Sequence, residues 1–371
     1  MTRTLGLALS GGGSRAAAFH LGCLRALNDR DLLERIRVVS GISGGSLLAA
    51  LWAYGPTDFA DFDAHTTDLL RSGLQLDIAR QAFKPSAAAR NLTAAARAGI
   101  RGLLSRHGGV SVARPANRTD ALAAVLTHKA FGTTTMADVT HPGLDVVLTA
   151  TDLATTNAVR FGSTRSGCSR SGCSRYGTIT EPIHVATAVA ASAAYPAFLP
   201  ALERTFTFQH RDGHHQQHTV LLTDGGVYDN LGLSVLEPGR SPHHTQHVYD
   251  VPFIISCDAG LGELALKAPH FMLGRLNRSF ATVHRKAQDS ARSRLHEWAA
   301  SGRIDGFALA YLGMKDDRLP APPADLVPRS AVGSYPTNFA AMTRSDFEAI
   351  TTRGEQLMRT VLPMYLRPAH R

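Results

Sequence analysis

Residues 36–52 read IRVVSGISGGSLLAALW, an apolar run followed by a glycine-flanked serine and then by a second apolar run. The first run, 36–40, predicts a strand, and the second, 47–52, predicts a helix. Between them lies Gly41-Ile42-Ser43-Gly44-Gly45, whose glycines permit the strained backbone of a sharp strand-to-helix turn. A hydroxyl held at such a turn projects from the top of a sheet, beside a helix N-terminus that stabilises negative charge. Ser43 is therefore the candidate nucleophile of an α/β protein.

The composition is that of a soluble globular protein. The chain has 371 residues, of which 44% are hydrophobic, enough to bury one large α/β core or two smaller ones. No apolar run reaches the roughly 18 residues that span a bilayer. The N-terminus begins a strand at Thr4 to Leu9 and shows no signal peptide. We expect a cytoplasmic protein or one associated peripherally with a membrane.

Charge and cysteine content narrow the partners and the cross-links. The formal net charge of +9 favours anionic partners, such as phospholipid headgroups, nucleic acid or acidic substrates. Four cysteines do not form a disulfide framework in a chain of this length. Cys168 and Cys173 lie in the tandem repeat 166–175, which predicts a flexible basic loop; a disulfide or a metal site in that loop is an alternative.

The order of elements predicts a parallel sheet that carries an insertion. Residues 4–54 read as strand, glycine turn, helix, strand, serine turn and helix, which is a βαβα unit. Residues 56–141 are rich in Ala and Arg with a helical pattern, and we interpret them as an inserted cap. The breaks in this pattern are Pro85, the pair Gly108-Gly109, and Pro115.

Further elements follow the cap. We expect them in this order: strands 144–151 and 158–161, a helix 184–194, hairpin strands 205–208 and 219–222 about the turn Asp212-Gly213, a strand 252–257, a helix 271–300, a strand 307–311, a loop 320–328 and a helix 345–362. No linker divides the chain. The sequence therefore predicts a single domain, 1–371, with its core motifs at 4–235, the cap at about 56–141 and a C-terminal helical part at about 260–371.

A second glycine turn follows the first strand. Consecutive N–H groups of Gly11-Gly12-Gly13 can stabilise the oxyanion that forms when a serine attacks a carbonyl. This loop and the Ser43 loop leave a parallel sheet at the same edge, where the sites of α/β proteins form. Arg15 can fix the loop or a substrate phosphate. The spacing to Ala16 also matches a dinucleotide fingerprint, but no acid stands at the end of the second strand to hold a ribose.

A candidate base follows a later strand. Asp224 comes directly after the apolar run 220–222, and Gly225-Gly226 allows another loop to approach it closely. An acid in this position can accept the serine proton if burial raises its proton affinity. The alternative is an ordinary Asp-Gly turn with no catalytic role.

In this order, the three motifs resemble the patatin-like phospholipase family. The family pattern is a Gly-Gly-Gly-x-Arg/Lys loop, a Gly-x-Ser-x-Gly turn about 30 residues later and a distal Asp-Gly-Gly/Ala. Weaker similarities occur in 19–27, in Ala150-Thr151-Asp152-Leu153 and in Ala190-Ala191-Ser192-Ala193-Ala194-Tyr195-Pro196. Together the similar stretches cover most of residues 5–235.

The resemblance implies a three-layer α/β/α sandwich with a mainly parallel central sheet. It also implies a Ser-Asp dyad that hydrolyses acyl esters of lipids through an acyl-enzyme, as a phospholipase A, lysophospholipase or related carboxylic ester hydrolase. No histidine base, metal or cofactor is expected. Carried over to this sequence, the site residues are Ser43 as nucleophile, Asp224 as base, Gly11, Gly12 and Gly13 as oxyanion donors, and Arg15, Gly41, Gly45, Gly225 and Gly226 in support.

Partners follow from the same resemblance. We expect a phospholipid or another acyl-ester lipid, contact with an anionic membrane surface, and no nucleic acid. Some members of the family need a protein activator, so such a partner is conceivable here. Two other functions stay open: a transacylase that passes the acyl group to an alcohol or lysophospholipid, and a non-catalytic protein that binds anionic lipid.

The histidines suggest two alternative interpretations, a catalytic triad and a metal site. Several follow Asp224 in the Ser, Asp, His order of an α/β-hydrolase triad: His243, His244, His247, His270, His284 and His296. That fold has several strands ahead of its nucleophile, whereas one βα unit precedes Ser43. Two His-His-x-x-His runs, at 214–218 and 243–247, invite a metal interpretation, but they lack the helix and the Glu of a zinc protease, so we interpret them as solvated histidines.

The predicted helix 271–300 is amphipathic and basic. Its apolar stripe comprises Phe271, Leu276, Phe280, Val283, Ala287 and Ala291, with Arg275, Arg278, Arg285, Lys286, Arg292 and Arg294 around it. Such a helix can lie on an anionic membrane. More often, the apolar stripe packs on a core and the charges face water, and we favour this interpretation.

Overall fold

The computed structural model describes residues 4–82, 117–163, 172–173, 175–196, 198–243, 245–262 and 270–366. Its strands are β1 (Leu5–Leu9), β2 (Ile36–Ile42), β3 (Asp145–Asp152), β4 (Asn157–Gly162), β5 (Gly172–Cys173), β6 (Gly177–Ile179), β7 (Leu202–Gln209), β8 (His215–Asp224), β9 (Phe253–Asp258) and β10 (Gly306–Tyr311). Its helices are α1 (Gly13–Asn28), α2 (Gly44–Tyr54), α3 (Phe59–Ser72), α4 (Gln75–Ala82), α6 (Arg118–Leu126), α7 (Val185–Ser192), α8 (Gly226–Asp229), α9 (Met272–Ala300), α10 (Arg329–Val332) and α11 (Arg344–Tyr365). Short helical turns lie at Leu33–Arg35, Thr127–Phe131, Leu233–Val235 and Asp316–Arg318.

Some predicted features lie outside these residues. The expected breaks of the cap at Pro85, Gly108-Gly109 and Pro115 fall in the stretch that is not described, as does Cys168. Cys173 is buried in β5. Inside the predicted cap, the described helices are α3, α4 and α6, and the predicted strands and helices after residue 141 are confirmed with small shifts of their ends.

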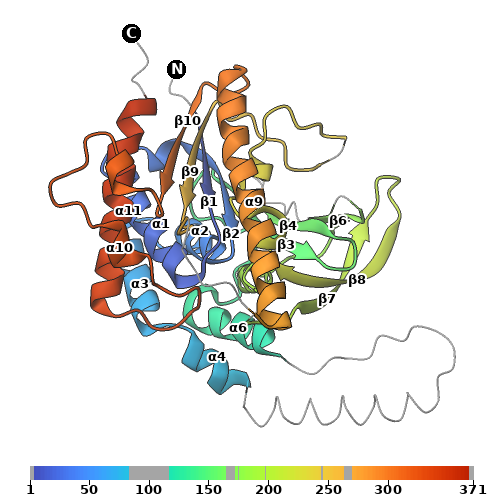
Figure 1. Ribbon diagram of the computed structural model, residues 1–371. Coiled ribbons are helices and arrows are strands. Elements are labelled where there is room, and N and C mark those ends of the chain that lie inside the picture. Colours follow the sequence, from blue (N-terminus) through green and yellow to red (C-terminus); the bar gives the residue numbers. More distant parts are fainter. Residues whose placement is uncertain are drawn as a thin grey trace.

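One half of the sheet is parallel. β10, β9, β1, β2 and β3 lie in this order and pair in parallel. Successive side chains of a strand point to opposite faces, and both faces are buried here: Leu5, Leu7 and Leu9 join one apolar cluster and Ala8 joins another. Helices α1, α2 and α11 cover the first face and the second half of α9 covers the other, so the parallel half has three layers (Figure 1).

The other half of the sheet is antiparallel, which corrects the expectation of a mainly parallel sheet. From β3 the order continues through β4, β5, β6 and β7 to β8, and every one of these neighbours is antiparallel. β8 then pairs with β3, which closes this half into a ring. Short connections favour this arrangement between β3 and β4, β5 and β6, and β7 and β8, because a parallel pair needs a long crossover while a hairpin needs a few residues. The chain from β6 to β7 instead passes through α7. β5 and β6 have 2 and 3 residues, too few for a recognisable sequence pattern.

Ring closure brings two strand ends together. β2 pairs with β3 as far as Ile42 opposite Thr149, and β8 pairs with the same strand from Asp224 opposite Ala150. Since β4 occupies the other edge of β3 over these residues, β2 and β8 share one edge and meet head to head. The residue after β2 is Ser43, and the last residue of β8 is Asp224.

Two helices of one face approach each other closely. A Cβ added at Gly22 of α1 would overlap the carbonyl oxygen of Thr351 in α11, and one added at Gly354 would overlap the carbonyl oxygen of Phe19. The lack of side chains at these two glycines therefore lets the helix backbones touch. No helix in the described part of the chain is both long enough and apolar enough to cross a membrane.

The helix α9 overturns the expectation that its apolar stripe packs on the core. Ala291, Leu295 and Trp298, in its second half, are buried against the sheet. In the first half, however, Leu276 and Val283 are exposed. A 29-residue helix is about 44 Å long, whereas a strand of 6 residues such as β9 spans about 20 Å. The helix is thus longer than the sheet that it covers.

We predict that Gly22→Ala destabilises the protein, because the new methyl group must push α1 away from α11. Overpacking of this kind typically costs about 1–3 kcal/mol of unfolding free energy, measurable by urea denaturation. Gly302→Ala is the matched control: nothing lies within 4 Å of its Cβ, and its φ of 70° leaves a backbone cost of about 1 kcal/mol. A Gly22→Ala variant as stable as the wild type would show that the helices do not touch as described.

Candidate active site

Ser43 lies at a strained turn between β2 and α2. Its φ of 52° and ψ of −117° are unusual for a residue with a side chain. Its N–H donates to the Oγ of Ser192 (3.0 Å), and its carbonyl accepts from the N–H of Leu47 (3.1 Å) in the first turn of α2. The side chain is almost fully buried. This is the geometry that the glycine-flanked serine predicted.

The Ser43 turn packs against the first glycine loop through backbone atoms. A Cβ added at Gly44 would overlap the carbonyl of Gly13, and one added at Gly45 would overlap the carbonyl of Leu9. Gly12, with φ 147°, turns the chain from β1 into α1. The two loops therefore lie side by side, as their shared sheet edge predicted.

One of the three predicted oxyanion donors is already engaged. The N–H of Gly11 donates to the carbonyl of Asn230 (3.0 Å), so this group is not available to an oxyanion. Among the described residues, the N–H groups of Gly12 and Gly13 have no acceptor. The next N–H, that of Ser14, donates to the carbonyl of Asn338 (2.8 Å). The candidate donors are reduced to Gly12 and Gly13.

Asp224 is buried next to Ser43. Its Oδ1 accepts a hydrogen bond from the N–H of Gly226 (2.7 Å), and its Oδ2 has no hydrogen-bond partner among the described residues. Burial raises the pKa of Asp224 to about 6, against smaller opposite effects of the Ser43 side chain and the Gly226 N–H. The effect of the Ser43 side chain on this pKa shows that its hydroxyl lies next to the Asp224 carboxyl.

Ser192, at the end of α7, connects the Ser43 turn to the turn that follows Asp224. Its Oγ accepts from the Ser43 N–H and donates to the carbonyl of Thr149 (2.6 Å), and its own carbonyl accepts from the N–H of Gly225 (3.1 Å). A Cβ added at Gly225 would overlap the same Thr149 carbonyl. The sequence around Ser192 does not indicate this role, because these bonds form across elements that are distant in sequence.

Two further supporting residues hold the turns. A Cβ at Gly41 would lie 2.8 Å from the Cα of Ser46, so that glycine lets α2 fold back on the end of β2. Arg15 is buried and donates to the carbonyls of Ala259 (3.3 Å) and Tyr335 (2.9 Å). Of its two predicted roles, the bonds support fixing the loop.

A pocket of about 190 Å³ opens over Ser43. Its described lining comprises Gly13, Ser43, Gln75, Ile78, Ala79, Arg118, Ala193, Tyr195, Phe198, Leu199, Thr337, Asn338 and Phe339. Most of these side chains are apolar, as an acyl chain requires. Helices α4 and α6, inside the predicted cap, contribute to the wall, and so does the loop 337–339, which carries no sequence motif.

Histidine does not line this pocket in the part of the chain that is described. Of the histidines considered for a triad, His284 lies against the backbone of Gly226; burial lowers its pKa, and the Gly226 contact raises it less. His214 and His218 belong to the β7–β8 hairpin, where His214 stacks on His210. Within the described ranges, no cluster of three or more His, Cys, Asp or Glu side chains is arranged to hold a metal ion.

Comparison with known proteins agrees with this geometry. The family model of patatin-like phospholipases matches residues 7–236. The chain belongs to the patatin-like phospholipase family. The matched range contains the loops of Gly12, Ser43 and Asp224, and no curated protein sequence matches the chain.

Solved structures of a human enzyme show the same fold. Human GIVD cytosolic phospholipase A2 is similar with a TM-score of 0.55 and 14% identity, over 96% of this chain and 61% of that one. Its complex with methyl γ-linolenyl fluorophosphonate has a TM-score of 0.52 and 16% identity, over 96% and 57%. VipD from Legionella pneumophila reaches 0.38 at 16% identity, over 97% and 66%. The patatin-like chain described here thus spans about three fifths of the human phospholipase.

We predict that Asp224→Asn changes stability in a pH-dependent way. A pKa raised from 3.8 to about 6 makes the ionised carboxyl about 3 kcal/mol less favourable in the folded state. The contribution of Asp224 to stability is therefore greatest below pH 3.8 and is lost as the pH rises through about 6. The difference in Tm, Asn variant minus wild type, should grow by a few degrees between pH 5 and about 7.5.

The matched control is Asp317→Asn, which removes an exposed carboxylate. Its Tm should follow the wild type at every pH, because water already solvates that group. Differential scanning fluorimetry at several pH values measures both variants. A Tm difference for Asp224→Asn that stays constant with pH would contradict the burial of an ionisable Asp224.

Proposed function

We propose that the chain is a lipid acyl hydrolase in which Ser43 is the nucleophile and Asp224 the general base. The observation that carries this proposal is the head-to-head meeting of β2 and β8, which sets a strained serine beside a buried carboxyl with a raised pKa. Strained nucleophile turns and perturbed carboxyls are both typical of active sites. Family membership supports an ester bond in a lipid as the target.

In the proposed reaction, one proton moves from Ser43 to Asp224 and then to the leaving alcohol. Asp224, ionised, takes the proton of the Ser43 hydroxyl as Oγ attacks the ester carbonyl. The N–H groups of Gly12 and Gly13, together with the positive N-terminal end of α1, stabilise the oxyanion. When the C–O bond breaks, the leaving alcohol takes the proton from Asp224 and an acyl-enzyme remains. Water then repeats the sequence and releases the fatty acid.

The apolar pocket suits the acyl chain of the substrate. Ile78, Phe198 and Phe339 line it, and Arg118 gives it one cationic side chain. A cation beside an apolar pocket matches a phospholipid, whose anionic headgroup lies next to its acyl chains. The formal charge of +9 favours contact with an anionic lipid surface, where such substrates occur. The proposal includes a protein activator, so the activity assays must also be run with a source of such an activator.

The pH profile of ester hydrolysis tests the dyad. With the soluble substrate p-nitrophenyl butyrate, kcat/KM of the wild type should rise with pH, with a midpoint near the pKa of about 6, because the base must be ionised. Ser43→Ala and Asp224→Asn should each lower kcat/KM by at least about 10³-fold. The same variants should release no fatty acid from phosphatidylglycerol vesicles.

The control is Ser72→Ala, a surface serine at the end of α3, which should behave as wild type. Assays are repeated with cell extract, which supplies an activator, and with added alcohol, whose acylated product would reveal a transacylase. Full activity of Asp224→Asn would refute the dyad. A wild type that binds lipid vesicles but turns over neither substrate, with or without extract, would point to a lipid-binding protein instead.

A further inference from the structure

The first half of α9 exposes a row of large apolar side chains. Met272 is 71% exposed, Leu276 60% and Val283 70%, and Phe271, just before the helix, is 68% exposed. Residues four and seven apart share a face of a helix, so Met272, Leu276 and Val283 form one stripe. Soluble proteins seldom expose such rows, and where they do, the row usually marks an interaction site.

The charge of the same stretch has one sign. Between Phe271 and Gln288 the chain carries Arg275, Arg278, Arg285 and Lys286 and no Asp or Glu. Arg275 and Lys286 are exposed, and each lies three residues from a member of the stripe, which places cations along its edge. An apolar stripe edged by cations matches the interface of an anionic bilayer, with acyl chains below and phosphates above.

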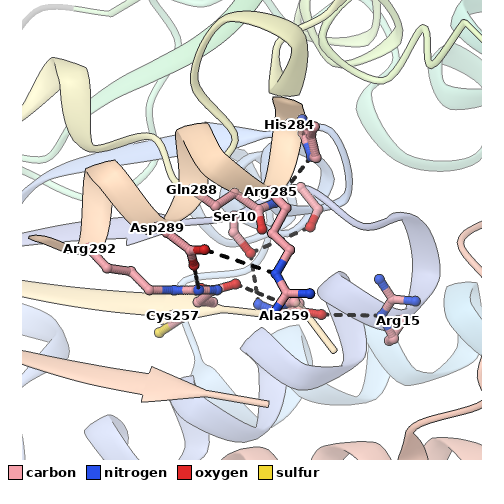
Figure 2. A network of polar contacts seen from close by, with 12 residues as sticks. Ser10, Arg15, Cys257, Ala259, His284, Arg285, Gln288, Asp289 and Arg292 are labelled. Atoms are coloured by element: carbon pink, nitrogen blue, oxygen red, sulfur yellow. Dashed lines mark hydrogen bonds and ion pairs between the residues drawn. The ribbon is translucent and has the colours of Figure 1, made fainter. Parts of the chain in front are cut away.

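The inner side of α9 is anchored to the sheet next to the active site. Figure 2 shows Arg292 beside Asp289, with which it forms an ion pair. The Nε of Arg292 also donates to the carboxylate of Asp258, at the end of β9 (2.8 Å). One turn earlier, Gln288 contacts His284 (3.1 Å). His284 reaches the backbone of Gly226, whose N–H holds the carboxylate of Asp224. A short series of contacts therefore connects α9, which carries the exposed stripe, to the loop of the candidate base.

A shorter helix next to α9 also exposes apolar side chains. Helix α8 packs against α9 and follows Asp224 and Gly225 directly. Its Val227 and Tyr228 are large residues that are partly exposed. Exposed apolar side chains therefore occur both on α9 and on the helix that follows Asp224.

We propose that the first half of α9, residues 271–287, docks on an anionic lipid bilayer and holds the active site at the membrane surface. The proposal deepens the proposed lipid hydrolase and rests on it, because it names the surface from which substrate is taken. Docking by this helix needs no conformational change, since its stripe is already exposed. Its strength should fall with ionic strength, as for any contact between cations and an anionic surface.

Vesicle flotation with the Ser43→Ala protein tests the docking separately from catalysis. Vesicles of phosphatidylcholine with 30% phosphatidylglycerol should bind this protein, and vesicles of pure phosphatidylcholine should bind it far less. Arg275→Glu with Lys286→Glu, and separately Leu276→Ser with Val283→Ser, should each weaken binding by about tenfold or more. The matched controls, Arg30→Glu with Arg344→Glu and Met364→Ser, change exposed residues away from α9 and should bind as Ser43→Ala alone.

The same α9 substitutions in the active protein separate this proposal from the proposed function. Turnover of p-nitrophenyl butyrate should stay within about twofold of wild type, and hydrolysis of vesicle lipid should fall with binding. Equal binding of all variants would overturn the docking proposal while leaving the dyad intact. The docking proposal is also overturned if the wild-type protein does not bind anionic vesicles and instead forms a dimer, or a complex with an acidic protein. In that case the α9 substitutions would disrupt the dimer or the complex.

Discussion

The close contact between two backbone turns determines the rest of the site. Gly44, after the serine, and Gly13, at the start of α1, touch through backbone atoms that a single Cβ would separate. This contact brings the N-terminal ends of α1 and α2 to one point, so both helix dipoles act on the same volume. It also brings the loop of Gly12 and Gly13, whose N–H groups have no acceptor in the described part of the chain, against the Ser43 turn. The proposed nucleophile and its electrostatic support therefore come from one packing constraint rather than from two.

Asp224, the proposed base, reaches this point by a different route, through the antiparallel half of the sheet. A strand can end opposite β2 because β8 runs against β3 and takes over its edge at Ala150. In an all-parallel sheet, the strand ends would lie side by side and no strand would face Ser43. The cost of this arrangement is a buried carboxyl, which is unfavourable when ionised. In the proposed mechanism, the raised pKa that results from this burial is useful, because a proton affinity near the working pH favours proton transfer.

Local sequence predicted the parts of the site that depend on neighbouring residues. The glycine-flanked serine, the glycine loop and the Asp-Gly-Gly turn each carry their own backbone requirements, and the structure has all three at one edge of the sheet. Contacts between distant segments were not predictable in the same way. Three contacts of this kind are consequences of packing. The carbonyl of Asn230 accepts from the Gly11 N–H, Ser192 bonds to the turns of Ser43 and Gly225, and Asn338 lies over Gly13. The strand β5 has two residues, which are too few for a periodic pattern. The closure of the antiparallel half into a ring was therefore not predictable from the sequence either.

The reach of α9 shows the same limit on a larger scale. Its amphipathic pattern predicted a helix correctly, yet a pattern does not state how far the sheet beneath extends. Ala291 and Leu295 belong to the core, while Leu276 and Val283 continue the pattern beyond the core's edge. Because α9 is longer than the sheet that it covers, its first half exposes an apolar surface that the sequence alone would assign to the interior.

Peptide mass spectrometry of the wild-type protein after incubation with a fluorophosphonate probe tests most directly whether Ser43 is the nucleophile of the proposed dyad. We expect a single phosphonyl adduct, which fragmentation places on Ser43 rather than on the nearby Ser40 or Ser46 of the same tryptic peptide. An adduct on another residue, or an unmodified Ser43 in a preparation that hydrolyses esters, would contradict this expectation.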